Sequence, residues 1–398
     1  MESSFWSLFL LPMIWLAFCD YDRIVQEIDF AVHGCRQFLR YDGARQVSPW
    51  EDIMTRFTRL LALSTSALVV ITLSTAAYAQ EFTFSIHHFL SPKSPAQTML
   101  LEPWVKAVEE ASDGRIAFEV FPAMSLGGAP PELFSQVRDG VADLVWTLPG
   151  YTPGTFPRTE VFELPNVHIG DARATNLAIQ DMMEDLAADY EDVHPILVHV
   201  HAGNALHVAT GSVTSAADFQ GLKVRSPSRT GAWVLEALKA EPVGMPVPAL
   251  PQALSKGTVD AALVPFEVAI PLGLAELTKQ SVELDQGGRF GTSSFLFAMN
   301  KTAYESLPAD LQQVIDDHSG MALAEEMGNA WNDIEPVGKK IAEDAGNQVV
   351  ALSPEATSEF QAPFEAVAQR WAQEARGLGI DGAALLEKAR AAVMAHSE

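Results

Sequence analysis

The clearest alternation of apolar and polar positions lies between residues 213 and 265. Residues 222–226 alternate with period two, as a half-buried strand does. Residues 230–240 carry apolar side chains at helical spacing, so one face can pack on a sheet. A second extended run, a second helix and a third strand follow at 242–247, 250–255 and 259–264. This order of strands and helices predicts parallel α/β layers.

Similar patterns predict strands and helices on both sides of that stretch. The predicted strands are 82–88, 116–121, 141–146 and 196–201, and the predicted helices are 97–111, 131–139 and 172–190. The strands 141–146 and 259–264 each follow a helix that ends in a charged residue and a glycine, which indicates two related lobes. The last hundred residues read as amphipathic helix, which we expect to break at Pro336 and near Pro354.

The beginning of the chain carries an export signal that starts late. Basic Arg56 and Arg59, an apolar core at 60–73 and the sequence Ala77-Tyr78-Ala79 predict a secretory signal peptide over 54–79. Residues 1–53 are then expected to be a mis-called upstream extension, disordered or non-native, with translation starting at Met54. The mature chain would begin at Gln80 and be periplasmic, in a Gram-negative bacterium.

Composition narrows the classes of partner. The chain has 26 basic and 51 acidic residues and a formal net charge of −25, which disfavours nucleic acid and anionic membranes as partners. Both cysteines, Cys19 and Cys35, precede the predicted mature start. The mature chain therefore has neither a disulfide nor a thiol nucleophile.

Motifs for catalysis, nucleotides and metals are missing from the sequence. It contains no G-x-S-x-G, G-x-x-x-x-G-K-[ST] or H-E-x-x-H pattern. His199 and His201 could share one strand face as a metal pair, but no cysteine or obvious third ligand completes a zinc set. We expect no cofactor, no metal and no enzymatic activity.

Arg225 is the strongest single candidate for ligand binding. It lies near the end of the strand at 222–226, and ligands of parallel sheets bind beyond the carboxyl ends of strands. A guanidinium there could grip a carboxylate or a phosphate with two hydrogen bonds. Its residue type and position alone favour an ion pair with a neighbouring surface acid, since charged residues mostly lie on solvated faces.

Several short motifs occur in an order that resembles one receptor family. They are the run 217–227 (ADFQGLKVRSP) and the segments Ser91–Pro95, Gly140–Asp143, Glu163–Pro165, Gly221–Arg225, Gly257–Asp260 and Met299–Lys301. Together they resemble the DctP-type solute-binding receptors of tripartite ATP-independent periplasmic (TRAP) transporters, over residues 80–398. The resemblance implies a two-lobed α/β periplasmic binding protein (type II-like), each lobe a mixed sheet flanked by helices, with a hinge and a long bridging helix.

The resemblance also implies a domain plan and partners. Residues 80–203 and 291–330 would form lobe I, 204–290 and 331–355 lobe II, and 356–398 C-terminal helices that pack on lobe I. The receptor, expected to be a monomer, would close on a small organic carboxylate. It would then deliver this ligand to the small and large membrane subunits of the transporter.

The family's pattern assigns roles to further residues. Arg225 would grip the ligand carboxylate, with His207 where the family often has a second arginine. His88, Trp146 and Tyr151 would contribute from lobe I, and Phe266 from lobe II; Trp146 could equally be core. The apolar run 261–264 replaces residues that are often polar in the family, which favours a ligand with an apolar or aromatic body.

Two other classes of protein remain alternatives. The chain could be the solute-binding protein of an ATP-driven importer, and an ATPase gene beside its own would indicate that. It could also be a secreted hydrolase, which a serine trapped by a phosphonate or turnover lost on chelation would reveal.

Overall fold

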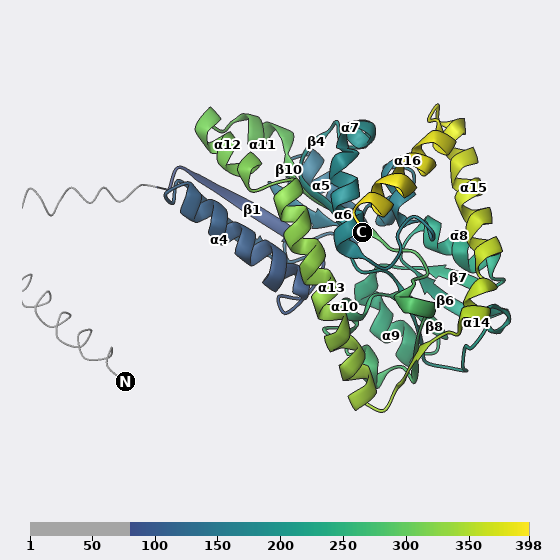
Figure 1. Cartoon of the computed structure of the whole chain (residues 1–398). Helices are drawn as coiled ribbons and strands as arrows, with labels where there is room; N and C mark the ends of the chain where they lie inside the picture. The colour runs from purple at the N-terminus through teal and green to yellow at the C-terminus, as the bar shows by residue number, and fades with distance from the viewer. Residues whose placement is uncertain (1–79, 398) are drawn as a thin grey trace, which may run out of the picture. The chain divides into compact units, whose positions relative to one another are not determined.

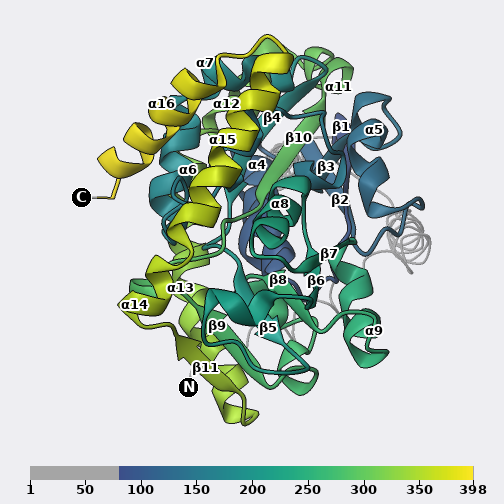
Figure 2. The same ribbon diagram turned by 90° about the vertical axis from the view of Figure 1, so that its right-hand side faces the viewer.

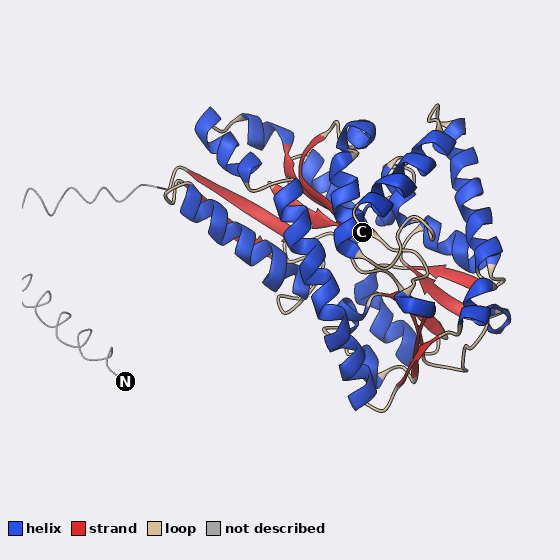
Figure 3. Ribbon diagram, in the orientation of Figure 1, coloured by secondary structure: helices blue, strands red, loops and turns tan. Residues whose placement is uncertain are grey.

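The computed structural model describes residues 80–397. The predicted upstream extension and signal peptide, residues 1–79, lie outside the described residues. Across the described part of the chain, no helix has the length and apolar character needed to cross a membrane. Two mixed sheets flanked by helices form this part, as Figure 3 shows in red and blue. The predicted α/β class is confirmed.

The first sheet has the strand order β2-β1-β3-β10-β4. Its strands are β1 (Phe82–His88), β2 (Ile116–Phe121), β3 (Leu144–Thr147), β4 (Val193–Val200) and β10 (Ser294–Asn300). Strand β1 pairs in parallel with β2 and β3, whereas β10 is antiparallel to both of its neighbours. Every residue of β10 is buried, as expected of a strand inside a sheet with both faces covered.

The second sheet has the order β11-β9-β5-β8-β6-β7. Its strands are β5 (Ala205–Val208), β6 (Lys223–Ser226), β7 (Glu241–Gly244), β8 (Ala261–Val264), β9 (Gln280–Glu283) and β11 (Gln348–Ala351). Strand β6 lies between β7 and β8 and is parallel to both. The predicted run of parallel strands and helices is therefore confirmed, with α8 (Arg229–Ala237) and α9 (Leu250–Ser255) as its helices.

The predicted helix 172–190 is helical over most of its length but is interrupted at Met182. Helix α6 ends at Asp181, because Met182 leaves the helical conformation at φ −105° and ψ 9°. Helix α7 then covers Met183–Leu186. The side chain of Asp171 starts α6 by accepting a hydrogen bond from the backbone of Ala174 at 3.1 Å, as an N-cap residue does.

The predicted break at Pro336 is also wrong. Helix α13 runs without interruption from Met321 to Asp344 and contacts α6 near its start and α10 (Phe266–Ala269) further on, as Figure 1 shows. Proline removes one backbone donor from a helix. Here the packing of α13 on elements of both sheets holds the helix together across that gap.

Glycines allow α13 to come this close to its neighbours. A Cβ at Gly328 would lie 2.3 Å from the Cα of Arg173, and one at Gly338 would lie 2.7 Å from the carbonyl oxygen of Phe266. Larger residues would therefore push α13 away from α6 and from α10.

The C-terminal helices contact elements of both sheets. Helix α15 (Gln361–Gly377) packs against α8, and α16 (Gly382–Ala395) packs against α6, an arrangement visible in Figure 2. The remaining helices are α4 (Glu102–Ala111), α5 (Leu133–Arg138), α11 (Lys301–Glu305), α12 (Ala309–Asp317) and α14 (Pro354–Ser358).

Candidate ligand-binding site

A small cavity lies between segments that belong to the two sheets. It is lined from the first sheet's side by residues near the ends of β1, β3 and β10, and from the second by residues of β6 and β8 and the loops around them. It holds about 350 Å³ of space free of protein atoms, its mouth included. Its lining is largely apolar and aromatic with a few polar groups, which is typical of small-molecule sites.

Arg225 lies in this cavity and is held by backbone oxygens. It is 2 % exposed and sits in β6 opposite Val243 of β7 and Ala262 of β8. Its Nε donates to the carbonyl oxygen of Met245 at 3.1 Å, and its Nη1 donates to that of Leu263 at 2.9 Å. Its Nη2 has no hydrogen-bond partner among residues 80–397.

Arg225 gives the cavity a buried positive charge that lacks a negative partner within the described chain. Burial lowers the pKa of Arg225, and the neighbouring Tyr151 opposes this shift. A guanidinium nevertheless stays protonated in proteins, so the cavity contains a buried positive charge. Buried charges are ordinarily paired because removing them from water is costly. A ligand anion at Nη2 would supply the missing partner.

Two further polar residues of the lining can assist an anion. The Nδ1 of His201 accepts the backbone N–H of Gly203 at 2.8 Å, and burial lowers the pKa of His201 well below 6.5. The imidazole is therefore neutral with its proton on Nε2, which makes Nε2 a donor. Asn204 is 1 % exposed and can donate to an anion through its Nδ2, whereas its Oδ1, an acceptor, has no hydrogen-bond partner within the described residues.

Aromatic rings form one wall of the cavity. The ring of Trp146 stacks on Phe89 at 5.2 Å and on Phe295 at 4.7 Å between centroids, and its Nε1 donates to Nε2 of His199 at 3.0 Å. The hydroxyl of Tyr151 accepts the backbone N–H of Val247 at 2.8 Å. Such a wall favours a flat, apolar ligand body.

Glu267 is a second ionisable group in the lining. It lies in the first turn of α10, directly after Pro265 and Phe266, and is 6 % exposed. Burial and the nearby Glu335 raise the pKa of Glu267 well above 4.5. Burial and this neighbouring acid therefore favour the uncharged form of the Glu267 carboxyl over the ionised one.

The structure brings three of the six predicted site residues together. Arg225, Trp146 and Tyr151 all line the cavity. His88 does not, because its two ring nitrogens are hydrogen-bonded within the first half of the chain, to Oε1 of Gln97 at 3.0 Å and to the backbone N–H of Leu90 at 3.3 Å.

His207 and Phe266 also lie away from this cavity. Their rings contact each other at 5.0 Å and line a separate hollow against α13. His207 is held between the carbonyl oxygen of Val264 at 3.2 Å and the hydroxyl of Ser281 at 3.0 Å. The side chain of His207 therefore links β5 to β8 and to β9 by hydrogen bonds.

Sequence reasoning missed His201, Asn204, Glu267 and Phe295. A signal existed for Asn204, because β5 is antiparallel to β8, so the residue before β5 lies beside the carboxyl end of β8. Glu267 follows that same strand end. His201 had been weighed as part of a metal pair with His199; over residues 80–397 no group of three His, Cys, Asp or Glu residues could hold a metal ion.

Comparison with known proteins identifies related chains. The model of one family, the bacterial extracellular solute-binding proteins of family 7, matches residues 86–374. A solved TRAP solute-binding protein from a marine metagenome, specific for aromatic acids and holding 3-hydroxybenzoate, is 40 % identical. The match covers 80 % of this chain and 100 % of that one, with a TM-score of 0.78.

Two further solved receptors show the same likeness. One from Rhodoferax ferrireducens, holding copurified benzoate, is 39 % identical over 79 % of this chain and 98 % of its own, with a TM-score of 0.77. One from Bordetella bronchiseptica, holding (R)- and (S)-mandelate, is 26 % identical over 78 % and 98 %, with a TM-score of 0.73.

Proposed function

Since the chain belongs to family 7 of the bacterial extracellular solute-binding proteins, the receptors of TRAP transporters, we propose that its cavity captures an aromatic carboxylate. Family and fold are those of a transport receptor. After export by the signal peptide at 54–79, the receptor delivers this ligand to the small and large membrane subunits. The relatives' bound benzoate and 3-hydroxybenzoate support the choice of ligand class.

The observation that carries the proposal is the unpaired edge of Arg225. The ligand carboxylate accepts from Nη2, and the nearby donors, Nε2 of His201 and the amide of Asn204, add hydrogen bonds to it. Hydrogen bonds between ionised partners are about twice as strong as neutral ones. The ring of the ligand then packs against Trp146 and Phe295.

Capture works by closure of the two lobes, 80–203 with 291–330 and 204–290 with 331–355. The cavity takes its lining from both, so a ligand there contacts both. Contacts made only in the closed form shift the population toward that form.

A thermal-shift assay tests the proposal. We expect benzoate and 3-hydroxybenzoate to raise the melting temperature of the wild type, and the uncharged isostere benzamide to leave it unchanged. Truncating one partner of a buried charge pair costs roughly 2–5 kcal/mol. Arg225→Ala should therefore weaken binding by about 30-fold or more. Arg225→Lys should rescue poorly, because an ammonium group cannot reproduce the planar fork that bonds the carbonyl oxygens of Met245 and Leu263 and presents Nη2 to the ligand.

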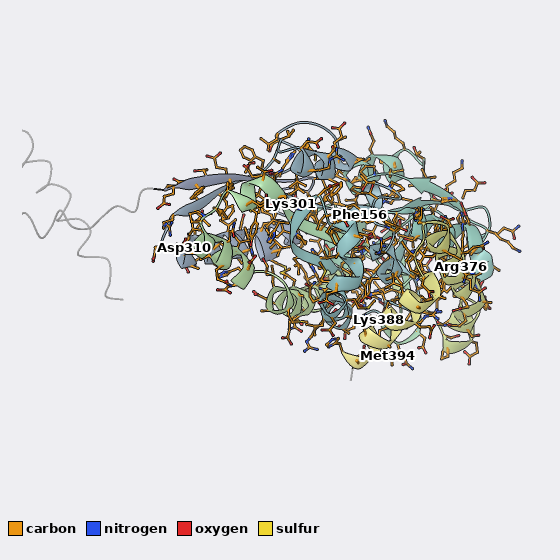
Figure 4. The ribbon with its side chains drawn as sticks, turned by 90° about the horizontal axis from the view of Figure 1, so that it is seen from above. Phe156, Lys301, Asp310, Arg376, Lys388 and Met394 are labelled. Atoms are coloured by element: carbon orange, nitrogen blue, oxygen red, sulfur yellow. The ribbon has the colours of Figure 1, made fainter. Side chains whose placement is uncertain are left out.

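A matched control uses Arg376→Ala, since Arg376 is exposed on the outer side of α15, as Figure 4 shows. That variant should bind like the wild type. A benzoate shift that survives Arg225→Ala, or a benzamide shift as large as that of benzoate, would contradict the proposal.

A further inference from the structure

Glu267 has no part in gripping a carboxylate, yet it is buried in the same cavity. No hydrogen bond or ion pair within residues 80–397 involves its carboxyl oxygens; its backbone N–H donates to Oε1 of Glu335 at 3.1 Å. A buried residue whose polar group has no protein partner ordinarily finds one in a ligand or a water molecule, and the cavity that Glu267 lines is the place for it. The lining beside it, Val264 and Val268, is apolar and offers no side-chain partner.

The charged groups nearest to α10 do not neutralise Glu267. Arg289 is committed to other acids: its Nη1 bonds Oε2 of Glu283, and its Nη2 bonds Oε2 of Glu335 at 3.1 Å. Lys339 bonds Glu283 as well, at 2.9 Å. The charge of Glu335 repels an ionised Glu267 and so raises the pKa of Glu267. No nearby positive charge among the described residues therefore favours the ionised form of Glu267, and a protonated carboxyl can both donate and accept a hydrogen bond.

We propose that Glu267 is a specificity-determining residue that hydrogen-bonds a hydroxyl group on the ring of the bound acid, so that the receptor prefers hydroxy-substituted aromatic acids. This inference rests on the proposed capture of an aromatic carboxylate. A hydroxyl donates and accepts, which matches both capacities of a protonated carboxyl. A ligand ammonium would need an ionised Glu267, which its burial and Glu335 oppose. The cavity is then polar at two places, one for the carboxylate and one for the hydroxyl.

Calorimetric titration of the exported protein tests this assignment. The ligands are benzoate, its 2-, 3- and 4-hydroxy derivatives and the corresponding methyl derivatives, which match the hydroxyl in size. In the wild type, at least one hydroxy isomer should bind about tenfold more tightly than both benzoate and its methyl counterpart, which corresponds to about 1.4 kcal/mol.

Two variants separate the hydroxyl contact from simple packing. Glu267→Leu should abolish the tenfold preference, so that no hydroxy isomer binds more tightly than its methyl counterpart. Glu267→Gln should keep most of the preference, because an amide also donates and accepts. Arg225→Ala should weaken all of these ligands alike.

The possible failures are distinct. If benzoate binds but no hydroxy isomer exceeds its methyl counterpart, or if the preference survives in Glu267→Leu, the role of Glu267 is overturned and the receptor function stands. If the wild type binds no aromatic carboxylate, the proposed function fails and this inference with it. Should Glu267→Leu not fold, as judged by circular dichroism, the hydroxy-versus-methyl comparison on the wild type still decides.

Discussion

Arg229 and Glu160 form an ion pair that ties α8 to the short helical segment Thr159–Glu163 after β3. The guanidinium makes two bonds to the carboxylate, at 2.7 and 2.6 Å, and Glu160 is largely buried with its side chain 6 % exposed. Replacing Arg229 with Met keeps the aliphatic stem and removes the charge. It also removes the contact of the guanidinium with the ring of Trp233 at 5.1 Å.

The effect of Arg229→Met on stability should depend on pH. Burial outweighs Arg229 and raises the pKa of Glu160 from 4.5 to about 7. Between these values the unfolded chain loses the proton that the folded protein keeps, so stability falls as pH rises and levels off above 7. Without Arg229 the folded pKa of Glu160 is higher still. The decline then continues above pH 7, by up to about 1.4 kcal/mol per pH unit.

The expected loss therefore has two parts. Below about pH 6 it is constant and about 1–2 kcal/mol, from the hydrogen bonds and the ring contact. At pH 8.5 it is larger by about 2 kcal/mol, since the extra decline spans about 1.5 pH units. Urea unfolding of the ligand-free protein from pH 5.5 to 8.5 measures both parts.

Two controls isolate the carboxyl of Glu160. In a Glu160→Gln background, Arg229→Met should cause a loss that does not change with pH. Arg370→Met removes another guanidinium that lies over the Trp233 ring, at 4.4 Å. The acidic partner of Arg370 is Glu236, which is half exposed, so this substitution should cause a small loss of stability that does not change with pH. A loss for Arg229→Met that is uniform over this pH range would refute the reasoning.

Two further predictions concern α10 and its surroundings. The pKa of Glu267 is well above 4.5 in the folded protein, so the stability of the wild type falls as pH rises from 4.5 through that folded pKa. Glu267→Gln should therefore melt at the same temperature as the wild type at pH 4 and at a higher temperature at pH 8. Equal melting temperatures at pH 8 would count against a buried neutral acid. Gly338→Ala places a Cβ 2.7 Å from the carbonyl oxygen of Phe266 and should lower the free energy of unfolding in urea by about 1–3 kcal/mol. The control Gly377→Ala, whose Cβ would have no atom within 4 Å, should be neutral or slightly stabilising. Equal effects of the two substitutions would argue against close packing of α13 on α10.

Local patterns predicted the parts of the fold that local interactions determine. The helix Leu250–Ser255 was predicted to the residue, and the strands around it were predicted within two or three residues. The pairing of β10 between β3 and β4 was not predictable, because strands more than ninety residues apart in the chain meet there. The continuity of α13 through Pro336 depends on equally distant contacts, with α6 and α10.

The site divides in the same way. The position of Arg225 at a strand end indicated the cavity, and so did the aromatic residues Trp146, at the end of β3, and Tyr151, in the loop after it. Periodicity could not decide which histidines face that cavity. A hydrogen bond to Gln97 holds His88 away from the cavity, and the backbone N–H of Gly203 fixes the orientation of the His201 ring. Neither hydrogen bond leaves a periodic pattern in the sequence.

The way Arg225 is held bears on how such receptors can diverge. Its two fixed bonds go to the main-chain oxygens of Met245 and Leu263, which every amino acid possesses. Point mutations at those positions change a side chain just after β7 or within β8 without removing the acceptors. The proposed anchor for the acid group therefore survives such mutations, whereas substitutions at Glu267 or along the aromatic wall change the lining of the cavity itself.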